Sequence, residues 1–292
     1  MTGVECVADV GARLGECPLW SPTEQVLYWV DIHGNTVHRH DPSSGTDESR
    51  DIGQRPGCLA LTAEPGRLLV ATENELVWLE WSTGETTPFV TLEDPSTGNR
   101  LNDGRCDPAG RLVVGTMWPE TGDGRRTGTL YRVEGDGSST TLRTGIGVPN
   151  GIAFDPERAR TYFADSFSAT VWVWDYDADT GERHDQRVFL DYSTLPGAPD
   201  GACVDADGCY WSASVHGWAV IRVTPDGDVD RRIELPLEKP SMPAFGGPDL
   251  STLYVTTIGD DSEPGRDGFV PGSLLAVDPG VHGVPEPHFA GG

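Results

Sequence analysis

The sequence has almost no lysine, no long hydrophobic run and no excess of positive charge. Lys239 is the only lysine among 21 basic residues, whereas 46 residues are acidic and the formal net charge is −25. So acidic a chain repels phosphate backbones, which argues against a nucleic-acid partner. No apolar stretch approaches the ~20 residues that span a bilayer, and residues 1–10 lack the basic and apolar regions of a secretory signal. We therefore expect a cytoplasmic protein without a membrane partner.

Several signatures of enzyme chemistry are also missing. The sequence contains no G-x-S-x-G nucleophile motif, no G-x-x-x-x-G-K-[ST] phosphate loop and no G-x-G-x-x-G dinucleotide motif. The cysteines form no C-x-x-C pair and no zinc-binding spacing, which indicates reduced, mostly buried thiols. These cysteines are Cys6, Cys17, Cys58, Cys106, Cys203 and Cys209.

Turn-forming residues are abundant, and they separate copies of one short apolar strand. The 37 Gly and 23 Pro are spread along the whole chain. Six strand copies start 41, 44, 49, 48 and 44 residues apart, close to the length of a four-stranded propeller blade. The copies span residues 27–31, 68–72, 112–116, 161–165, 209–213 and 253–257. The spacing predicts an all-β fold, a six-bladed β-propeller of four-stranded blades forming a single domain over residues 1–292.

The residues before Glu16 are too few to form a blade of their own. We expect this N-terminal segment to add a strand to the last blade and so close the ring.

Polar residues recur upstream of four of these strands. Glu16, Asn102, Asn150 and Asp200 lie 11, 10, 11 and 9 residues before the next apolar strand. Blades radiate from an axis, so equivalent residues of different blades converge on the central channel. We therefore expect these two carboxylates and two amides to meet near the axis, immediately before the innermost strands.

Asn-Gly and Asp-Gly are also ordinary turn formers, and for any isolated copy this interpretation stays open. Asp107, Asp155 and Asp207 fall between paired strands, and we assign them to turns. Glu16 before Cys17 and a proline has no such rationale. Converging oxygens without a matching basic cluster repel one another unless a cation lies between them. Oxygen ligands suit Ca²⁺, Mg²⁺ or Mn²⁺, and three of them leave positions for water and substrate.

Five motifs together resemble the family of senescence marker protein, gluconolactonase and regucalcin, whose members are six-bladed propellers. The resemblance extends over nearly the whole chain, and Cys17 stands where members more often carry glycine. The motifs are Leu14-Gly-Glu-Cys-Pro-Leu-Trp20, Arg100-Leu-Asn-Asp-Gly104, Val148-Pro-Asn-Gly-Ile-Ala-Phe154, Pro199-Asp-Gly201 and Phe245-Gly-Gly247.

The resemblance implies specific roles for six residues. Glu16, Asn150 and Asp200 would hold one divalent metal ion, which is Ca²⁺, Mg²⁺, Mn²⁺, Zn²⁺ or Fe²⁺. Asp200 would also transfer protons as the catalytic acid and base. The hydroxyl and ring oxygens of the substrate would bind to Arg100, Asn102 and Glu120.

The activity implied is metal-dependent hydrolysis of a sugar aldonolactone, of the gluconolactone or xylonolactone type, to the aldonic acid. A metal acting as Lewis acid fits ester hydrolysis, because it stabilises the oxyanion and lowers the pKa of bound water. The partner is then a small-molecule sugar lactone, and the protein a monomer or small homo-oligomer. Two alternatives remain open: a hydrolase of organophosphates or other lactones, and a non-catalytic calcium-binding propeller.

Overall fold

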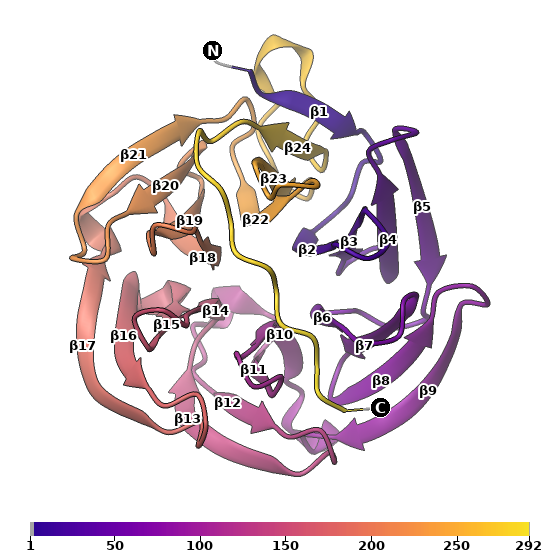
Figure 1. Ribbon diagram of the computed structural model, residues 1–292, viewed down its shortest axis with the longest axis vertical. Coiled ribbons are helices and arrows are strands. Elements are labelled where there is room, and N and C mark those ends of the chain that lie inside the picture. Colours follow the sequence, from indigo (N-terminus) through magenta and orange to yellow (C-terminus); the bar gives the residue numbers. More distant parts are fainter. Residues whose placement is uncertain (1–2, 292) are drawn as a thin grey trace.

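The computed structural model describes residues 3–291, which form 24 β-strands in six four-stranded antiparallel sheets. The sheets are arranged as blades around a central axis (Figure 1). This confirms the predicted six-bladed β-propeller. Within the described residues no helix has the length and apolar character needed to cross a membrane.

The first three blades each follow the chain outward from the axis. Blade 1 contains β2 (Gly15–Ser21), β3 (Val26–Asp31), β4 (Thr36–Asp41) and β5 (Thr46–Asp51). Blade 2 contains β6 (Cys58–Leu61), β7 (Arg67–Ala71), β8 (Glu75–Glu80) and β9 (Glu85–Thr91). Blade 3 contains β10 (Arg100–Cys106), β11 (Leu112–Met117), β12 (Gly128–Val133) and β13 (Ser139–Ile146).

The next two blades repeat this order, and the sixth is completed by the N-terminal strand. Blade 4 contains β14 (Pro149–Asp155), β15 (Arg160–Asp165), β16 (Thr170–Tyr176) and β17 (Arg183–Asp191). Blade 5 contains β18 (Ala198–Val204), β19 (Tyr210–Val215), β20 (Ala219–Val223) and β21 (Val229–Glu234). Blade 6 contains β22 (Pro240–Gly246), β23 (Thr252–Thr257), β24 (Leu274–Val277) and β1 (Glu5–Ala8).

The N-terminal strand closes the ring as predicted. β1 pairs antiparallel with β24, with Glu5 opposite Ala276 and Cys6 opposite Leu275. The first strand of the chain is therefore the outer strand of the last blade. Backbone hydrogen bonds between the two ends of the sequence hold the ring shut.

The recurring apolar strand of the sequence is the second strand of each blade, counted from the axis. In β3, for example, every residue from Val26 to Asp31 is buried. Such a strand is paired on both edges and covered on both faces, which explains why it reads as a nearly continuous apolar run.

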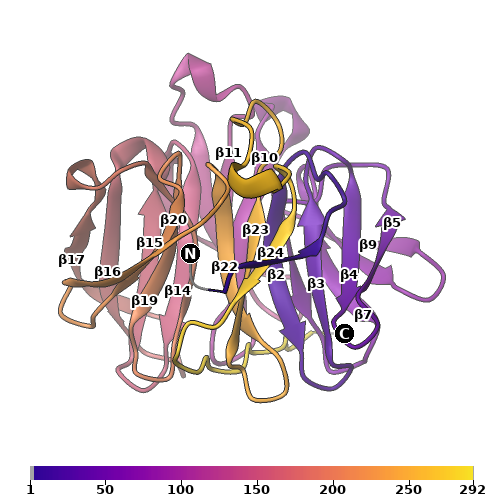
Figure 2. The same ribbon diagram turned by 90° about the horizontal axis from the view of Figure 1, so that it is seen from above.

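The position of the polar residues differs slightly from the prediction. We expected them immediately before the innermost strands, but they lie inside these strands, as the second or third residue. The reason is that backbone pairing continues past them: Gly15 pairs with Asp31, and Pro149 with Asp165. We call this end of the channel the mouth and the opposite end the base; Figure 2 shows the ring from the side.

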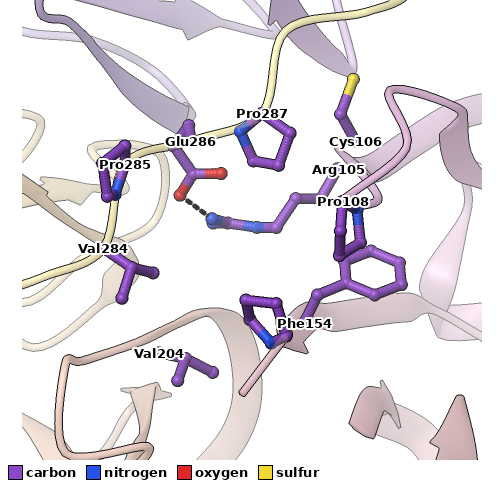
Figure 3. A pocket seen from close by; sticks show the side chains of 10 residues that line it. Arg105, Cys106, Pro108, Phe154, Val204, Val284, Pro285, Glu286 and Pro287 are labelled. Carbon is purple, nitrogen blue, oxygen red and sulfur yellow. Dashed lines mark hydrogen bonds and ion pairs between the residues drawn. The ribbon is translucent and has the colours of Figure 1, made fainter. Parts of the chain in front are cut away.

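The last residues of the chain cross the base. Residues 278–291, which we call the C-terminal strap, run from blade 6 across the centre of the ring (Figure 1). Phe289 is buried and donates its N–H to the Leu61 carbonyl at 2.8 Å. Glu286 of the strap forms an ion pair with Arg105 of β10, as Figure 3 shows. The strap thereby covers the base of the channel.

Candidate active site

A cavity of about 260 Å³ lies at the mouth, where the innermost strands begin. Five of the six predicted site residues line it, and each is at most 9% exposed. They are Glu16, Arg100, Asn102, Asn150 and Asp200. The structure therefore brings together side chains from blades 1, 3, 4 and 5 that are far apart in the sequence.

Glu120 is the predicted residue that does not line this cavity. It is exposed and directly precedes the short 3-10 turn η2 (Thr121–Asp123), and it is Thr121 that lines the cavity. The charge of Glu120 contributes to the raised pKa of Arg55, whose largest cause is the hydrogen bond from Arg55 to Glu73. Glu120 thus belongs to the rim of the mouth, near that ion pair.

The polar side chains are presented by β-bulges. In each of the four strands that carry them, the register with the second strand shifts at the polar residue, and a bulge of this kind redirects side chains. The shifts lie between Glu16 and Leu19, Leu101 and Gly104, Asn150 and Ala153, and Pro199 and Ala202. By contrast, the first strand of blade 2 pairs without a shift over Cys58–Leu61 and is apolar throughout.

The bulge beside Glu16 requires an unusual backbone conformation. Cys17 has φ of 46°, in the left-handed region, and Gly151 has φ of 61° in the bulge of blade 4. Glycine adopts such angles without strain, which accounts for the glycine that the resembled family more often carries at Cys17. Here the Cys17 Sγ accepts a hydrogen bond from the Leu59 N–H at 3.3 Å. This contact links blade 1 to blade 2 and supports the strained residue.

The carboxylates of the site are buried against one another. Burial is the main cause that raises the pKa of Glu16 well above its ordinary value, followed by the charges of Asp200 and Asp103. The pKa of Asp200 is raised well above its ordinary value by burial and then by the charge of Asp103. Arg100 opposes both shifts only weakly. The cluster is therefore short of positive charge.

Asp103, which the sequence analysis did not assign to the site, does not line the cavity, but its charge is among the causes that raise the pKa of Glu16 and of Asp200. The Asp103 Oδ2 accepts a hydrogen bond from the Ile152 N–H at 3.1 Å, whereas its buried Oδ1 has no partner. Burial raises its pKa to about 6. The available signal was a second polar residue directly after Asn102, in a strand that otherwise reads as buried.

These features fit a divalent cation. Glu16, Asn150 and Asp200 offer oxygen ligands, and an unpartnered carboxylate oxygen on Asp103 lies in the same acidic cluster. Within residues 3–291 no three His, Cys, Asp or Glu side chains are grouped to hold a metal. A cation held here would therefore need the carboxamide oxygen of Asn150 as a ligand. Hard oxygen donors of this kind suit Ca²⁺, Mg²⁺ or Mn²⁺.

Arg100 and Asn102 form a connected donor pair beside these ligands. The Arg100 Nη1 donates to the Asn102 Oδ1 at 2.7 Å and to the Leu101 carbonyl at 2.9 Å. The Asn102 Nδ2 donates to the Pro149 carbonyl at 2.9 Å and to the Asn150 Oδ1 at 3.2 Å. Burial lowers the pKa of Arg100 to about 10, so its guanidinium remains charged at neutral pH.

Comparison with known proteins identifies the family. Residues 14–259 match the family described as SMP-30/Gluconolactonase/LRE-like region. The chain is 37% identical to a pentonolactonase, XacC, of Haloferax volcanii over 96% of each chain. It is 38% identical to a 6-deoxy-6-sulfogluconolactonase of Pseudomonas putida over 99% of each chain. A solved structure of a calcium-binding protein, regucalcin, from Agrobacterium tumefaciens superposes with a TM-score of 0.91 at 29% identity, covering 99% of this chain and 97% of that one. The chain therefore belongs to the SMP-30/gluconolactonase/regucalcin family and is similar to sugar lactonases within it.

Proposed function

We propose that the protein is a divalent-cation-dependent lactonase that opens a sugar aldonolactone, of the gluconolactone or xylonolactone type, to its aldonic acid. One observation carries the proposal: three buried side chains with oxygen atoms suited to a cation, Glu16, Asn150 and Asp200, line one cavity with Arg100 and Asn102. The similarity to a pentonolactonase and a 6-deoxy-6-sulfogluconolactonase supports a sugar lactone as substrate.

Asp200 is the proposed acid and base. A bound divalent cation supplies Lewis acidity toward the lactone carbonyl and lowers the pKa of water. The Asp200 carboxylate takes the proton of the attacking water as the bond from the water oxygen to the carbonyl carbon forms. It then returns this proton to the ring oxygen as the ester bond breaks, which leaves a carboxylic acid and a free hydroxyl. Burial raises the pKa of Asp200 in the absence of a cation, and a bound cation would offset part of that rise.

Arg100 and Asn102 hold the substrate. Both side chains are buried and line the cavity. The Arg100 guanidinium bonds Asn102 and Leu101 through Nη1 and donates its other N–H groups to lactone oxygens, whereas the Asn102 oxygen has a second lone pair that accepts a hydrogen bond from a sugar hydroxyl. Glu120, on the rim, accepts a hydrogen bond from an outer hydroxyl of the sugar. A purely aliphatic lactone has no hydroxyl group to donate to these acceptors, which disfavours such substrates.

The test is lactone opening before and after removal of metal. The protein is treated with chelator, dialysed, checked for residual metal by elemental analysis and supplied separately with Ca²⁺, Mg²⁺, Mn²⁺, Zn²⁺ or Fe²⁺. Acid release is then followed with a pentonolactone, a hexonolactone, an aliphatic lactone and a phosphotriester. We expect activity to be lost and then restored by at least one ion, with the sugar lactones preferred.

The same assay separates the alternatives. Preference for the phosphotriester or the aliphatic lactone would show that the substrate belongs to a class other than sugar lactones. Tight cation binding without turnover of any substrate would instead favour the non-catalytic calcium-binding protein. Undiminished lactone opening by metal-free protein would refute the proposed chemistry.

A further inference from the structure

A chain of side-chain hydrogen bonds crosses the site from blade 3 to blade 5. Arg100 donates to the Asn102 Oδ1 at 2.7 Å, and the Asn102 Nδ2 donates to the Asn150 Oδ1 at 3.2 Å. The Asn150 Nδ2 in turn donates to the Ser166 Oγ at 2.9 Å. The Ser166 hydroxyl finally donates to the Pro199 carbonyl at 2.6 Å.

The two ends of this chain determine the direction of every bond in it. A guanidinium only donates hydrogen bonds and a peptide carbonyl only accepts them. Arg100 therefore requires the oxygen of the Asn102 amide, which turns the Asn102 nitrogen toward Asn150. At the other end the Pro199 carbonyl takes the Ser166 hydrogen, so Ser166 accepts from the Asn150 nitrogen. Both constraints leave the Asn150 oxygen on the side of the channel that carries Asn102.

We propose that Ser166 is a positioning residue, which fixes the carboxamide of Asn150 with its oxygen toward the cation site. This inference rests on the proposed function only in taking Asn150 as a cation ligand. The Asn150 oxygen has two lone pairs, one for the Asn102 N–H and one for a cation. The Asn150 nitrogen cannot ligate a cation, because an amide N–H₂ offers no lone pair.

The acidic surroundings of Asn150 explain why this orientation needs support. Glu16 and Asp200 are buried carboxylates that line the same cavity as Asn150. In the metal-free protein they attract hydrogen-bond donors, so an amide free to rotate would turn its N–H₂ toward them. That rotation would remove a cation ligand and replace it with a competing donor. The Ser166 hydroxyl opposes the rotation by giving the Asn150 nitrogen an acceptor on the opposite side.

The position of Ser166 is itself fixed by the local fold. It begins the 3-10 turn η3 (Ser166–Ser168), and its N–H donates to the Val148 carbonyl at 3.0 Å. Asp165, which precedes it, accepts hydrogen bonds from Val148 N and Phe167 N, both at 3.1 Å. The turn is thus tied to the segment that leads into Asn150, so the hydroxyl and the carboxamide keep a constant relation.

The test is the affinity of the protein for Mn²⁺, measured without any lactone by isothermal titration and by the electron paramagnetic resonance of free Mn²⁺. Outer-shell partners of metal ligands typically contribute ~10- to 100-fold in metal affinity. We therefore expect S166A to raise the dissociation constant for Mn²⁺ by about tenfold or more. S166T keeps the hydroxyl and should bind Mn²⁺ nearly as the parent does.

S168A is the matched control, because Ser168 lies in the same turn and its hydroxyl donates to Asp165 instead of contacting Asn150. Parent-like Mn²⁺ affinity is expected for it. In an N150D background, S166A should lose most of its effect, because either carboxylate oxygen can face the cation. If S166A does not fold, S166C, which keeps a weaker donor and acceptor, should show an intermediate loss.

The outcomes separate this inference from the proposed function. Equal Mn²⁺ affinity of folded S166A and parent, or an equal loss in S168A, would overturn the role of Ser166 while leaving the lactonase untouched. A parent that binds Mn²⁺ but opens no lactone would overturn the proposed function while the loss in S166A still supports the positioning role. A parent without affinity for any divalent cation would overturn both.

Discussion

The mouth and the base of the channel both contain buried aspartates, but the two sets differ in how their oxygens are satisfied. At the base, Asp205 accepts hydrogen bonds from Asp207 N, Cys209 N, the Trp211 indole and Arg222, at 2.7–3.0 Å. Asp107 similarly accepts from backbone N–H groups of its turn and from Arg111. At the mouth, Asp103 has one oxygen without a partner.

This difference teaches that burial of an acid does not by itself indicate a site. The turns predicted at Asp107 and Asp207 are confirmed: Gly110 N donates to the Asp107 carbonyl, and Asp207 lies in the turn between β18 and β19. The base acids are therefore structural, since each charge is compensated by donors from its own blade. The acids near the mouth have fewer donors: Glu16 accepts one hydrogen bond, from Cys17 N at 3.1 Å, and Asp103 accepts one from Ile152 N and leaves its other oxygen without a partner. Such a missing partner is what calls for a ligand.

The largest expected effect is the loss of turnover in Asp200→Asn. Removing a general acid or base costs ~10²- to 10⁴-fold in rate, and here a proposed cation ligand is weakened as well. The metal-free variant should nevertheless be as stable as the parent or more so, because one of three mutually repelling carboxylates is gone. Lactone hydrolysis and urea unfolding in chelator measure the two effects. Full activity would remove Asp200 from the mechanism.

The matching change at the base, Asp205→Asn, should have the opposite profile. It leaves the buried Arg222 guanidinium without the most buried of its three carboxylate partners, and breaking a buried ion pair costs about 3 kcal/mol. Asp207 and Asp230 also pair with Arg222 and limit the loss. Urea unfolding should show this destabilisation, whereas kcat and KM of the folded variant stay at parent values. A loss of kcat without a loss of stability would contradict the division between mouth and base.

The fold was largely predictable from the sequence, because its determinants are local. Each second strand is buried on both faces and therefore apolar along its length, which makes the six repeats visible. The convergence of Glu16, Asn150 and Asp200 follows from the same repeat once the blades are placed around an axis.

The remaining features depend on contacts between blades, and these leave no periodic pattern. Asp103 meets the Ile152 N–H of blade 4, and Ser166 connects Asn150 to the carbonyl of Pro199 in blade 5. The residue spacing within one blade does not indicate whether a side chain has a hydrogen-bond partner in the neighbouring blade. Likewise Glu120 lies in a long connection, whose path over the rim is set by packing and not by strand register.

A smaller effect is expected in the pH dependence of stability of the metal-free protein. The folded-state pKa values of Glu16 and Asp200 are raised, and that of Asp103 is about 6. The folded state therefore binds protons at these carboxyl groups more tightly than the unfolded state does. The resulting contribution to the free energy of unfolding is complete below the ordinary carboxyl pKa of ~4. It is lost as the pH rises through the folded-state values.

The melting temperature in chelator should therefore fall between about pH 4 and pH 7, and saturating Mn²⁺ should reduce that fall. Because the overall acidity of the chain also destabilises it at higher pH, Asp200→Asn is the control. Its metal-free melting temperature should fall less steeply than that of the parent. Identical slopes would show that the mouth carboxylates are compensated in the folded state, as those at the base are.

The smallest expected effect belongs to Glu120→Ala, which tests how far the site extends onto the rim. Glu120 is exposed and lies outside the cavity lining, so it loses at most one partly hydrated hydrogen bond to the sugar. Such a bond is worth about 1 kcal/mol, which predicts a roughly fivefold higher KM with kcat unchanged. Asp123→Ala, in the following turn and paired with Arg125 at the surface, should leave both constants unchanged. The rise in KM should disappear with a lactone that lacks the outer hydroxyl. A parallel fall in kcat would instead place Glu120 at the reacting atoms. The mouth would then contain a catalytic carboxylate that is exposed to solvent.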